Sequence, residues 1–279
     1  MGKFSRTWQL MGASWCLLKQ DKRLVVFPML SGVVLTLVIV SFAVPLFSTG
    51  MQHHLSAATR NNPDTYAVAF LFYFVSYCVL IFFNSALIAC VLKQMAGGEP
   101  TLGYGLRYAW QRLPQLFGWA LLTSTVGFVL RLIEERVGFI GRIIVSVLGM
   151  AWTVTSFLVV PVLVAEGKGP LDAYKKSVAM FKRTWGEQII GNVSFGLMFL
   201  LLGIVPVVVV ILLGLIVNPV TLVVIGPIAV MYVIALALVQ STLQAIYQVA
   251  IYRYATDGKA PDGFDGRLIA ESFRLKGKR

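Results

Sequence analysis

Three amide side chains recur at every fourth position in the last long apolar stretch of the chain: Gln240, Gln244 and Gln248. This spacing places them on one face of a helix. Together with the adjacent Ser241, and with Asn84 in an earlier apolar stretch, they form a set that we name the polar seam. Two interpretations stay open. The amides either hydrogen-bond neighbouring helices, at about 0.6–2 kcal/mol per bond, or line a polar cavity or a lipid-headgroup groove open to the cytoplasm.

Other residue types that carry catalytic or metal-binding chemistry do not converge in the sequence. The only two histidines, His53 and His54, are adjacent and cannot share one helical face, whereas a metal site requires three or four convergent ligands. The acids Glu134 and Glu135 lie close to Arg131, which favours local ion pairing over catalysis by paired carboxylates. We therefore predict no catalytic residue, no cofactor-binding residue and no metal ligand, and a protein that is not an enzyme.

The elements that must position the polar seam are membrane helices. Of the 279 residues, 58% are hydrophobic and 13% are charged, whereas about 25% are charged in soluble domains. We predict an all-α polytopic membrane protein with a single membrane domain over residues 1–279, including an amphipathic leader (1–23) and a tail (253–279). Six spans each contain the roughly 20 apolar residues that a bilayer core requires. Their predicted ranges are 24–47, 66–92, 116–133, 143–165, 189–217 and 223–252.

The distribution of cations predicts the orientation of these spans. Of the 24 Lys and Arg residues, 20 lie in the leader, the second and fourth loops and the tail, and 4 lie in the loops of the opposite side. Because cytoplasmic loops carry the excess of cations, we predict a multi-pass protein of the inner (plasma) membrane with both termini in the cytoplasm. Every acid falls in a loop or at the end of a span, which disfavours proton transport through a buried carboxylate.

Basic amphipathic segments precede the first, third and fifth predicted spans. Apolar residues of the leader recur at spacings of four and three: Phe4, Trp8, Met11, Trp15 and Leu18. That pattern suits either a helix lying on the membrane surface or a cytoplasmic helix packed on the bundle. Similar segments begin after Pro100 and Pro170. The chain is thus predicted to contain three units, each a basic amphipathic cytoplasmic helix followed by a two-span hairpin.

These basic segments predict which partners the protein contacts. Cations next to membrane spans face the anionic headgroups of the cytoplasmic leaflet. They do not indicate nucleic-acid binding, because no soluble basic domain with base-stacking aromatic residues accompanies them. A second copy of the chain or another membrane protein is a further possible partner. The predicted contacts to anionic lipid are Lys3, Arg6, Lys19, Lys22, Arg23, Arg107, Arg112, Lys175, Lys176, Lys182, Arg183 and Arg253.

Several motifs resemble known membrane proteins. GKFSRTW at residues 2–8, ASW at 13–15, FPMLSG at 27–32 and IYRYATDG at 251–258 resemble an uncharacterised family of prokaryotic six-span inner-membrane proteins over the full length. This resemblance implies a six-span fold and no established chemistry. The segment PLDAYKKS at 170–177, continuing to Trp185, is similar to membrane domains attached to glycerophosphodiester phosphodiesterases. No phosphodiesterase domain is present in this chain, so the second likeness implies no activity.

Three functions are compatible with these patterns. We favour a non-enzymatic membrane protein that assembles with itself or a partner, or organises anionic lipid through its basic helices. The alternative is a channel or facilitator for a small or lipidic solute that uses a cavity lined by the glutamines. An intramembrane enzyme is disfavoured, because the spans contain no convergent nucleophile, base and metal ligands.

Overall fold

The computed structural model describes residues 3–48, 63–182, 199–200, 202–208 and 220–258. Every regular element among these residues is a helix, in agreement with the predicted all-α class. The chain forms two compact units, one made of Met1–Val25 with Lys182–Arg279 and the other of Val26–Phe181. The single membrane domain over residues 1–279 stays a prediction.

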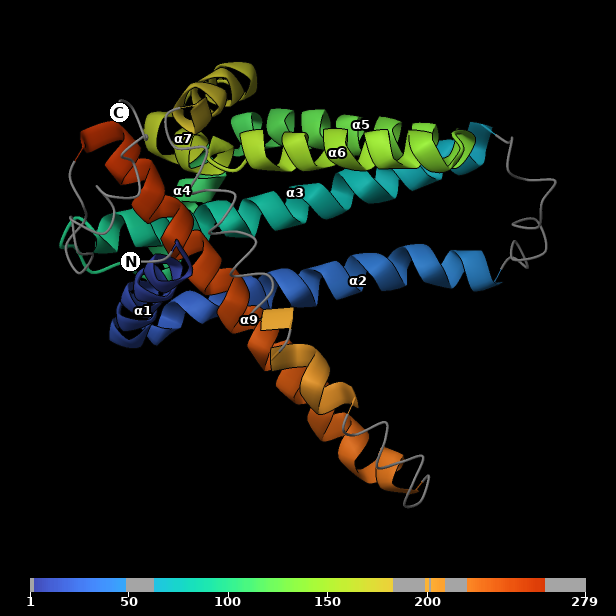
Figure 1. Cartoon of the computed structure of the whole chain (residues 1–279), viewed down its shortest axis with the longest axis horizontal. Helices are drawn as coiled ribbons and strands as arrows, with labels where there is room; N and C mark the ends of the chain where they lie inside the picture. The colour runs from blue at the N-terminus through green and yellow to red at the C-terminus, as the bar shows by residue number, and fades with distance from the viewer. Residues whose placement is uncertain (1–2, 49–62, 183–198, 201, 209–219, 259–279) are drawn as a thin grey trace. The chain divides into compact units, whose positions relative to one another are not determined.

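The unit Val26–Phe181 is built around its longest helix. Its elements are α2 (Val26–Ser48), α3 (Pro63–Gln94), α4 (Leu102–Gln111), α5 (Leu113–Arg136), α6 (Phe139–Thr155), α7 (Val159–Glu166) and a helix that begins at residue 170. Helix α3 contacts α2, α4, α5 and α7, and α6 contacts α5. Figure 1 shows α5 and α6 running side by side along α3. The third predicted span, 116–133, lies within α5, and the fourth, 143–165, extends over α6 and α7.

Five stretches of the described chain are long and apolar enough to cross a membrane. They are Lys22–Val44, Tyr66–Gln94, Leu113–Arg136, Phe139–Glu166 and Ile225–Asp257. They correspond to five of the six predicted spans, and most of the remaining one, 189–217, lies outside the described residues. Many large apolar side chains on these helices are exposed, as expected of surfaces that face lipid. The protein is therefore membrane-embedded, and the arrangement of six spans in three hairpins stays a prediction.

Helix α4 approaches α3 at a position that only glycine can occupy. The helix starts at an N-cap, where Thr101 Oγ1 accepts a hydrogen bond from the backbone N–H of Tyr104 at 3.2 Å. One turn later, a Cβ atom on Gly105 would lie 2.7 Å from the backbone oxygen of Ala86 and 2.7 Å from Cys90 Sγ. Close helix contact through small residues is a common way of packing membrane helices. Gly105 therefore sets the distance between α4 and α3.

The fourth predicted span is broken in the structure. Helix α6 ends at Thr155 and α7 begins at Val159, whereas the sequence predicts one continuous span over 143–165. Pro161 explains the break, because it has no N–H and its ring would clash with the carbonyl of Phe157 in a continuous helix. As the third residue of α7, the proline is tolerated, since N–H groups of the first turn have no helical acceptor.

A serine from the helix over residues 170–182 satisfies the backbone at this break. Ser177 Oγ accepts a hydrogen bond from the N–H of Leu158 at 3.2 Å and donates one to the carbonyl of Thr155 at 2.6 Å. Both Ser177 and Leu158 are buried. Because lipid offers no hydrogen bonds, exposed backbone groups at this depth require a partner from the protein. Ser177 supplies that partner.

The C-terminal end of α7 is held by residues from α4 and from the helix over residues 170–182. Gly167 ends α7 with a φ of 64°, the left-handed conformation that glycine adopts without strain. Tyr108 Oη donates to the carbonyl of Val164 at 3.0 Å and so satisfies one carbonyl of the last turn. Glu166 Oε1 lies 2.5 Å from Lys176 Nζ. These contacts fix the short helix α7 in place.

The unit containing both ends of the chain is built from α1 (Lys3–Gln20), the 3-10 helix η1 (Lys22–Val25) and α9 (Val220–Asp257). Helix α1 packs on α9, and Ser14, Leu17 and Leu18 are buried. Trp15 is 42% exposed although it belongs to the same predicted apolar series as Leu18. One side of α1 thus packs on a helix while Trp15 stays available to a membrane surface, so both interpretations of the leader stay open.

Candidate functional site

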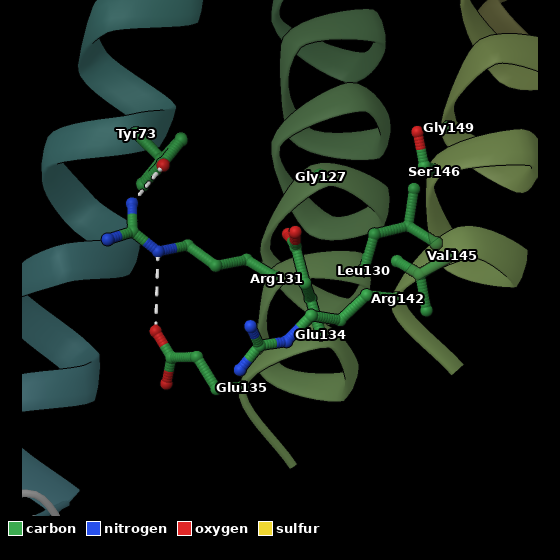
Figure 2. Close-up of a pocket in the computed structure, with 10 residues that line it drawn as sticks. All are labelled: Tyr73, Gly127, Leu130, Arg131, Glu134, Glu135, Arg142, Val145, Ser146 and Gly149. Carbon is green, nitrogen blue, oxygen red and sulfur yellow. Dashed lines mark hydrogen bonds and ion pairs between the residues drawn. The ribbon is translucent and has the colours of Figure 1, made fainter. Parts of the chain in front are cut away.

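A polar pocket lies where α5 ends and α6 begins. Its volume is about 660 Å³, and Figure 2 shows the side chains that line it. They come from α3, α5 and α6, three helices of one compact unit. The lining residues are Tyr73, Gly127, Leu130, Arg131, Glu134, Glu135, Arg142, Val145, Ser146 and Gly149.

The pocket follows matching faces of α5 and α6. Four of the five lining residues on α5, and all four on α6, are spaced by three, four and seven positions from the first of their set, which places each set on one helical face. Charged residues occupy the end near the α5–α6 connection, where Glu134 and Arg142 lie. The other end is formed by Gly127 and Gly149. The site is therefore charged at the end of the helices, lined by Leu130, Val145 and Ser146 one turn further in, and bounded by the two glycines beyond them.

Arg131 organises one wall of the pocket. Its Nη1 donates a hydrogen bond to Tyr73 Oη at 2.5 Å, and its Nε lies 3.5 Å from Glu135 Oε1 (Figure 2). The guanidinium carbon also lies 5.8 Å from the centroid of the Tyr73 ring. The local ion pairing predicted for this segment is confirmed by Arg131 and Glu135. The link to Tyr73, 58 residues away in sequence, was not predicted.

Two charged side chains in the pocket, those of Glu134 and Arg142, remain available to bind a ligand. Among the described residues, the side chains of Glu134 and Arg142 form no hydrogen bond and no ion pair, and both are exposed. The pocket therefore offers a carboxylate and a guanidinium that a ligand can engage without displacing a protein partner. Chemically, such a site can bind a group that carries both a negative and a positive charge.

The structure places the residues of the polar seam in different surroundings. Gln248 is buried, Gln240 is partly buried, and Ser241 and Gln244 are exposed in the described chain. Asn84 is partly buried on α3, in the other compact unit, so its predicted membership of the polar seam stays a prediction. The three glutamines lie on the helix α9 as the predicted repeat requires, but among them only Gln248 is buried.

We expect Gln248→Leu and Gln244→Leu to differ, although the two glutamines are one helical turn apart. Gln248 is buried and interacts within the protein. Its replacement leaves a polar partner unsatisfied and should lower the free energy of unfolding by about 1–3 kcal/mol. Gln244 is exposed, so its replacement should change stability by about 0.5 kcal/mol or less. Thermal unfolding of the two purified variants in detergent measures the difference, and equal losses would contradict the surroundings described above.

Some of the predicted lipid-contact cations are engaged within the protein. Lys176 pairs with Glu166, and Arg253 Nε lies 3.7 Å from Asp257 Oδ2. Contact of these two cations with lipid would therefore compete with an ion pair inside the protein. The side chains of three further predicted residues lie outside the described part of the chain: Lys3, Arg6 and Arg183.

Most of the remaining predicted cations are exposed, and Arg112 is partly buried. Lys175 lies 3.8 Å from Asp172 in a largely exposed pair, and Arg112 lies over the ring of Tyr108 at 5.7 Å. Exposed pairs of this kind contribute little to stability, so Lys175 can exchange its partner. Five others are exposed and form no ion pair with any described residue: Lys19, Lys22, Arg23, Arg107 and Lys182.

Comparison with known protein families gives one match. Residues 64–264, well over half of the chain, match the model of DUF6159, a family of unknown function. The chain belongs to this family. The DUF6159 match includes the pocket and the polar seam. It begins after the leader, so it does not cover the leader motifs that carry part of the predicted resemblance. No curated protein matches the chain. The likeness to domains attached to glycerophosphodiester phosphodiesterases stays a prediction.

Proposed function

We propose that this member of the DUF6159 family is a non-enzymatic integral protein of the inner membrane that organises anionic phospholipid on the cytoplasmic side. The observation that carries the proposal is the group of exposed side chains around the connection of α1 and η1. Here Trp15, Lys19, Lys22 and Arg23 are exposed within a few residues of a membrane span. The cation distribution in the sequence supports a cytoplasmic position of this connection.

The chemistry of these side chains suits a lipid headgroup layer. Tryptophan is enriched at the membrane–water interface, and Lys19 Nζ lies 5.7 Å from the Trp15 ring. The carboxylate of Asp21 accepts a hydrogen bond from the backbone N–H of Arg23 at 3.0 Å, so it caps the 3-10 helix instead of pairing with a cation. Each basic residue near an anionic surface contributes about 1 kcal/mol. Three such residues can therefore enrich anionic lipid around the protein.

We expect the triple variant Lys19→Gln, Lys22→Gln, Arg23→Gln to lose its preference for anionic lipid. At about 1 kcal/mol per cation, the affinity for phosphatidylglycerol should fall by up to about 100-fold, and less at high salt. Native mass spectrometry of full-length protein titrated with the lipid measures this change. The charge-preserving variant Lys19→Arg, Lys22→Arg is the matched control and should bind as before. An unchanged affinity in the triple variant would refute the proposal.

A channel or facilitator for a small or lipidic solute is the second candidate. The observation that favours it is the exposure of Gln244 beside the buried Leu243, since a pore-lining amide requires access to water. The two glutamine variants separate the candidates. A loss of stability confined to Gln248→Leu supports a packed helix, whereas two neutral variants would support hydrated amides and a polar path. Assembly with a second copy or with another membrane protein is a further part of the proposal that the lipid titration does not test.

A further inference from the structure

The polar pocket between α3, α5 and α6 has the charges of a zwitterion receptor. We propose that it binds a phosphate ester that carries a primary ammonium group, in the form of the headgroup of an ethanolamine phospholipid. This site is distinct from the cations around the connection of α1 and η1, and it does not depend on the function proposed for them.

The phosphate would be bound by Arg142, Arg131 and Tyr73. Arg142 is without a protein partner among the described residues, and Arg131 uses only two of its five N–H donors in its bonds to Tyr73 and Glu135. Tyr73 Oη accepts the bond from Arg131, which leaves its own hydrogen to donate. Guanidinium groups form short, charge-assisted hydrogen bonds to phosphate. The lining of the pocket thus supplies donors from three helices, α3, α5 and α6 (Figure 2).

The ammonium group would be bound by Glu134. Its carboxylate is exposed in the pocket and accepts hydrogen bonds, which a primary ammonium donates and a quaternary choline cannot. Choline is instead recognised by aromatic faces. Tyr73 is the one aromatic residue among those lining the pocket, and its ring already lies under the Arg131 guanidinium. The chemistry of the pocket therefore favours ethanolamine over choline.

The position of the pocket favours a lipid over a soluble phosphate ester. Arg142 lies in the first turn of α6, so the charged end is within about 5 Å of the end of the helix, at the depth of headgroups. Next to it, α6 carries exposed apolar side chains that acyl chains can cover: Ile140, Ile143, Ile144, Val147 and Leu148. A headgroup in the pocket can therefore continue into chains that lie along the lipid-facing side of α6.

The test uses full-length protein in detergent, titrated with short-chain phosphatidylethanolamine, phosphatidylcholine or phosphatidylglycerol, with bound lipid counted by native mass spectrometry. We expect phosphatidylethanolamine to bind at least about tenfold more tightly than the other two. Arg142→Gln should weaken this binding about tenfold or more, and Glu134→Gln should make the ethanolamine and choline lipids equivalent. Arg136→Gln is the matched control, because Arg136 is an exposed cation at the same end of α5 that does not line the pocket.

Two outcomes would overturn the proposal: equal binding of the three lipids by the unmodified protein, or an equal loss in Arg136→Gln and Arg142→Gln. Thermal unfolding of each variant confirms that it is folded, which is expected because these three side chains are exposed. Competition with phosphoethanolamine identifies the source of the ligand. Displacement only by intact lipid assigns the pocket to a headgroup, and displacement at equal concentration assigns it to a soluble ester of the same chemistry. The Lys19, Lys22 and Arg23 variants should leave ethanolamine binding unchanged.

Discussion

Gly105→Ala is expected to destabilise the protein by about 3 kcal/mol, although it adds a single methyl group. The new Cβ would lie 2.7 Å from three atoms of the same compact unit: the backbone oxygen of Ala86, Cys90 Sγ and Phe27 Cζ. The Phe27 ring can rotate away, but the α3 backbone can move only if α4 moves with respect to α3. Overpacking of a close contact typically costs about 1–3 kcal/mol, and occasionally more where the backbone must shift.

Gly103→Ala is the matched control for this prediction. Gly103 lies on the same helix two residues earlier, and a Cβ atom there would meet no atom within 4 Å. Because alanine has the higher helix propensity, this variant should be stabilised by about 0.5–1 kcal/mol. Thermal unfolding in detergent compares the two variants. Similar stabilities would mean that α4 does not approach α3 as closely as the structure shows.

Ser177→Ala is expected to lower the free energy of unfolding by about 2–5 kcal/mol. The change removes the single hydroxyl that bonds both the N–H of Leu158 and the carbonyl of Thr155 in the break between α6 and α7. Each buried group that loses its partner costs about 1–3 kcal/mol, and lipid cannot replace the lost bonds. The effect should be a lower midpoint of thermal unfolding and faster proteolysis of the segment between α6 and α7.

Ser156→Ala controls for the loss of a hydroxyl at the same break. Ser156 Oγ donates to the carbonyl of Thr153 at 3.2 Å, and this bond is exposed. Its removal should change stability by about 0.5 kcal/mol or less. A larger loss in Ser156→Ala than in Ser177→Ala would show that the break is stabilised by its own turn and not by the helix over residues 170–182.

The sequence predicted the membrane helices well because their signal is compositional. An uninterrupted apolar stretch such as 66–92 has no stable alternative in a bilayer, and the structure has α3 over Pro63–Gln94. The ion pair of Arg131 and Glu135 was predictable for a similar reason, since residues four apart on a helix are neighbours. Both features depend on residues that are close in sequence.

The break, the contact at Gly105 and the pocket could not be predicted, because each depends on contacts distant in sequence. Pro161 signals a possible interruption, but the partner that makes the break tolerable, Ser177, belongs to another helix. Likewise, Arg131 is conspicuous as a cation inside a span, yet only the structure brings it against Tyr73. In the polar seam, regular spacing on α9 groups Gln244 and Gln248, but only the structure shows that Gln244 is exposed and Gln248 is buried; their common role stays a prediction.

The dependence of the break on Ser177 also constrains how the protein is made. Leu158 and Ser177 are 19 residues apart, and the ribosome adds roughly 5–20 residues per second, so the serine follows roughly one to four seconds later. During that interval these two backbone groups of the apolar stretch Phe139–Glu166 have no partner from the protein, and each would cost several kcal/mol in lipid. The nascent segment containing α6 and α7 must therefore remain in a hydrated environment, such as the insertion machinery, until the next helix has been synthesised. Release of these helices into the bilayer is thus coupled to the synthesis of a segment outside their own span.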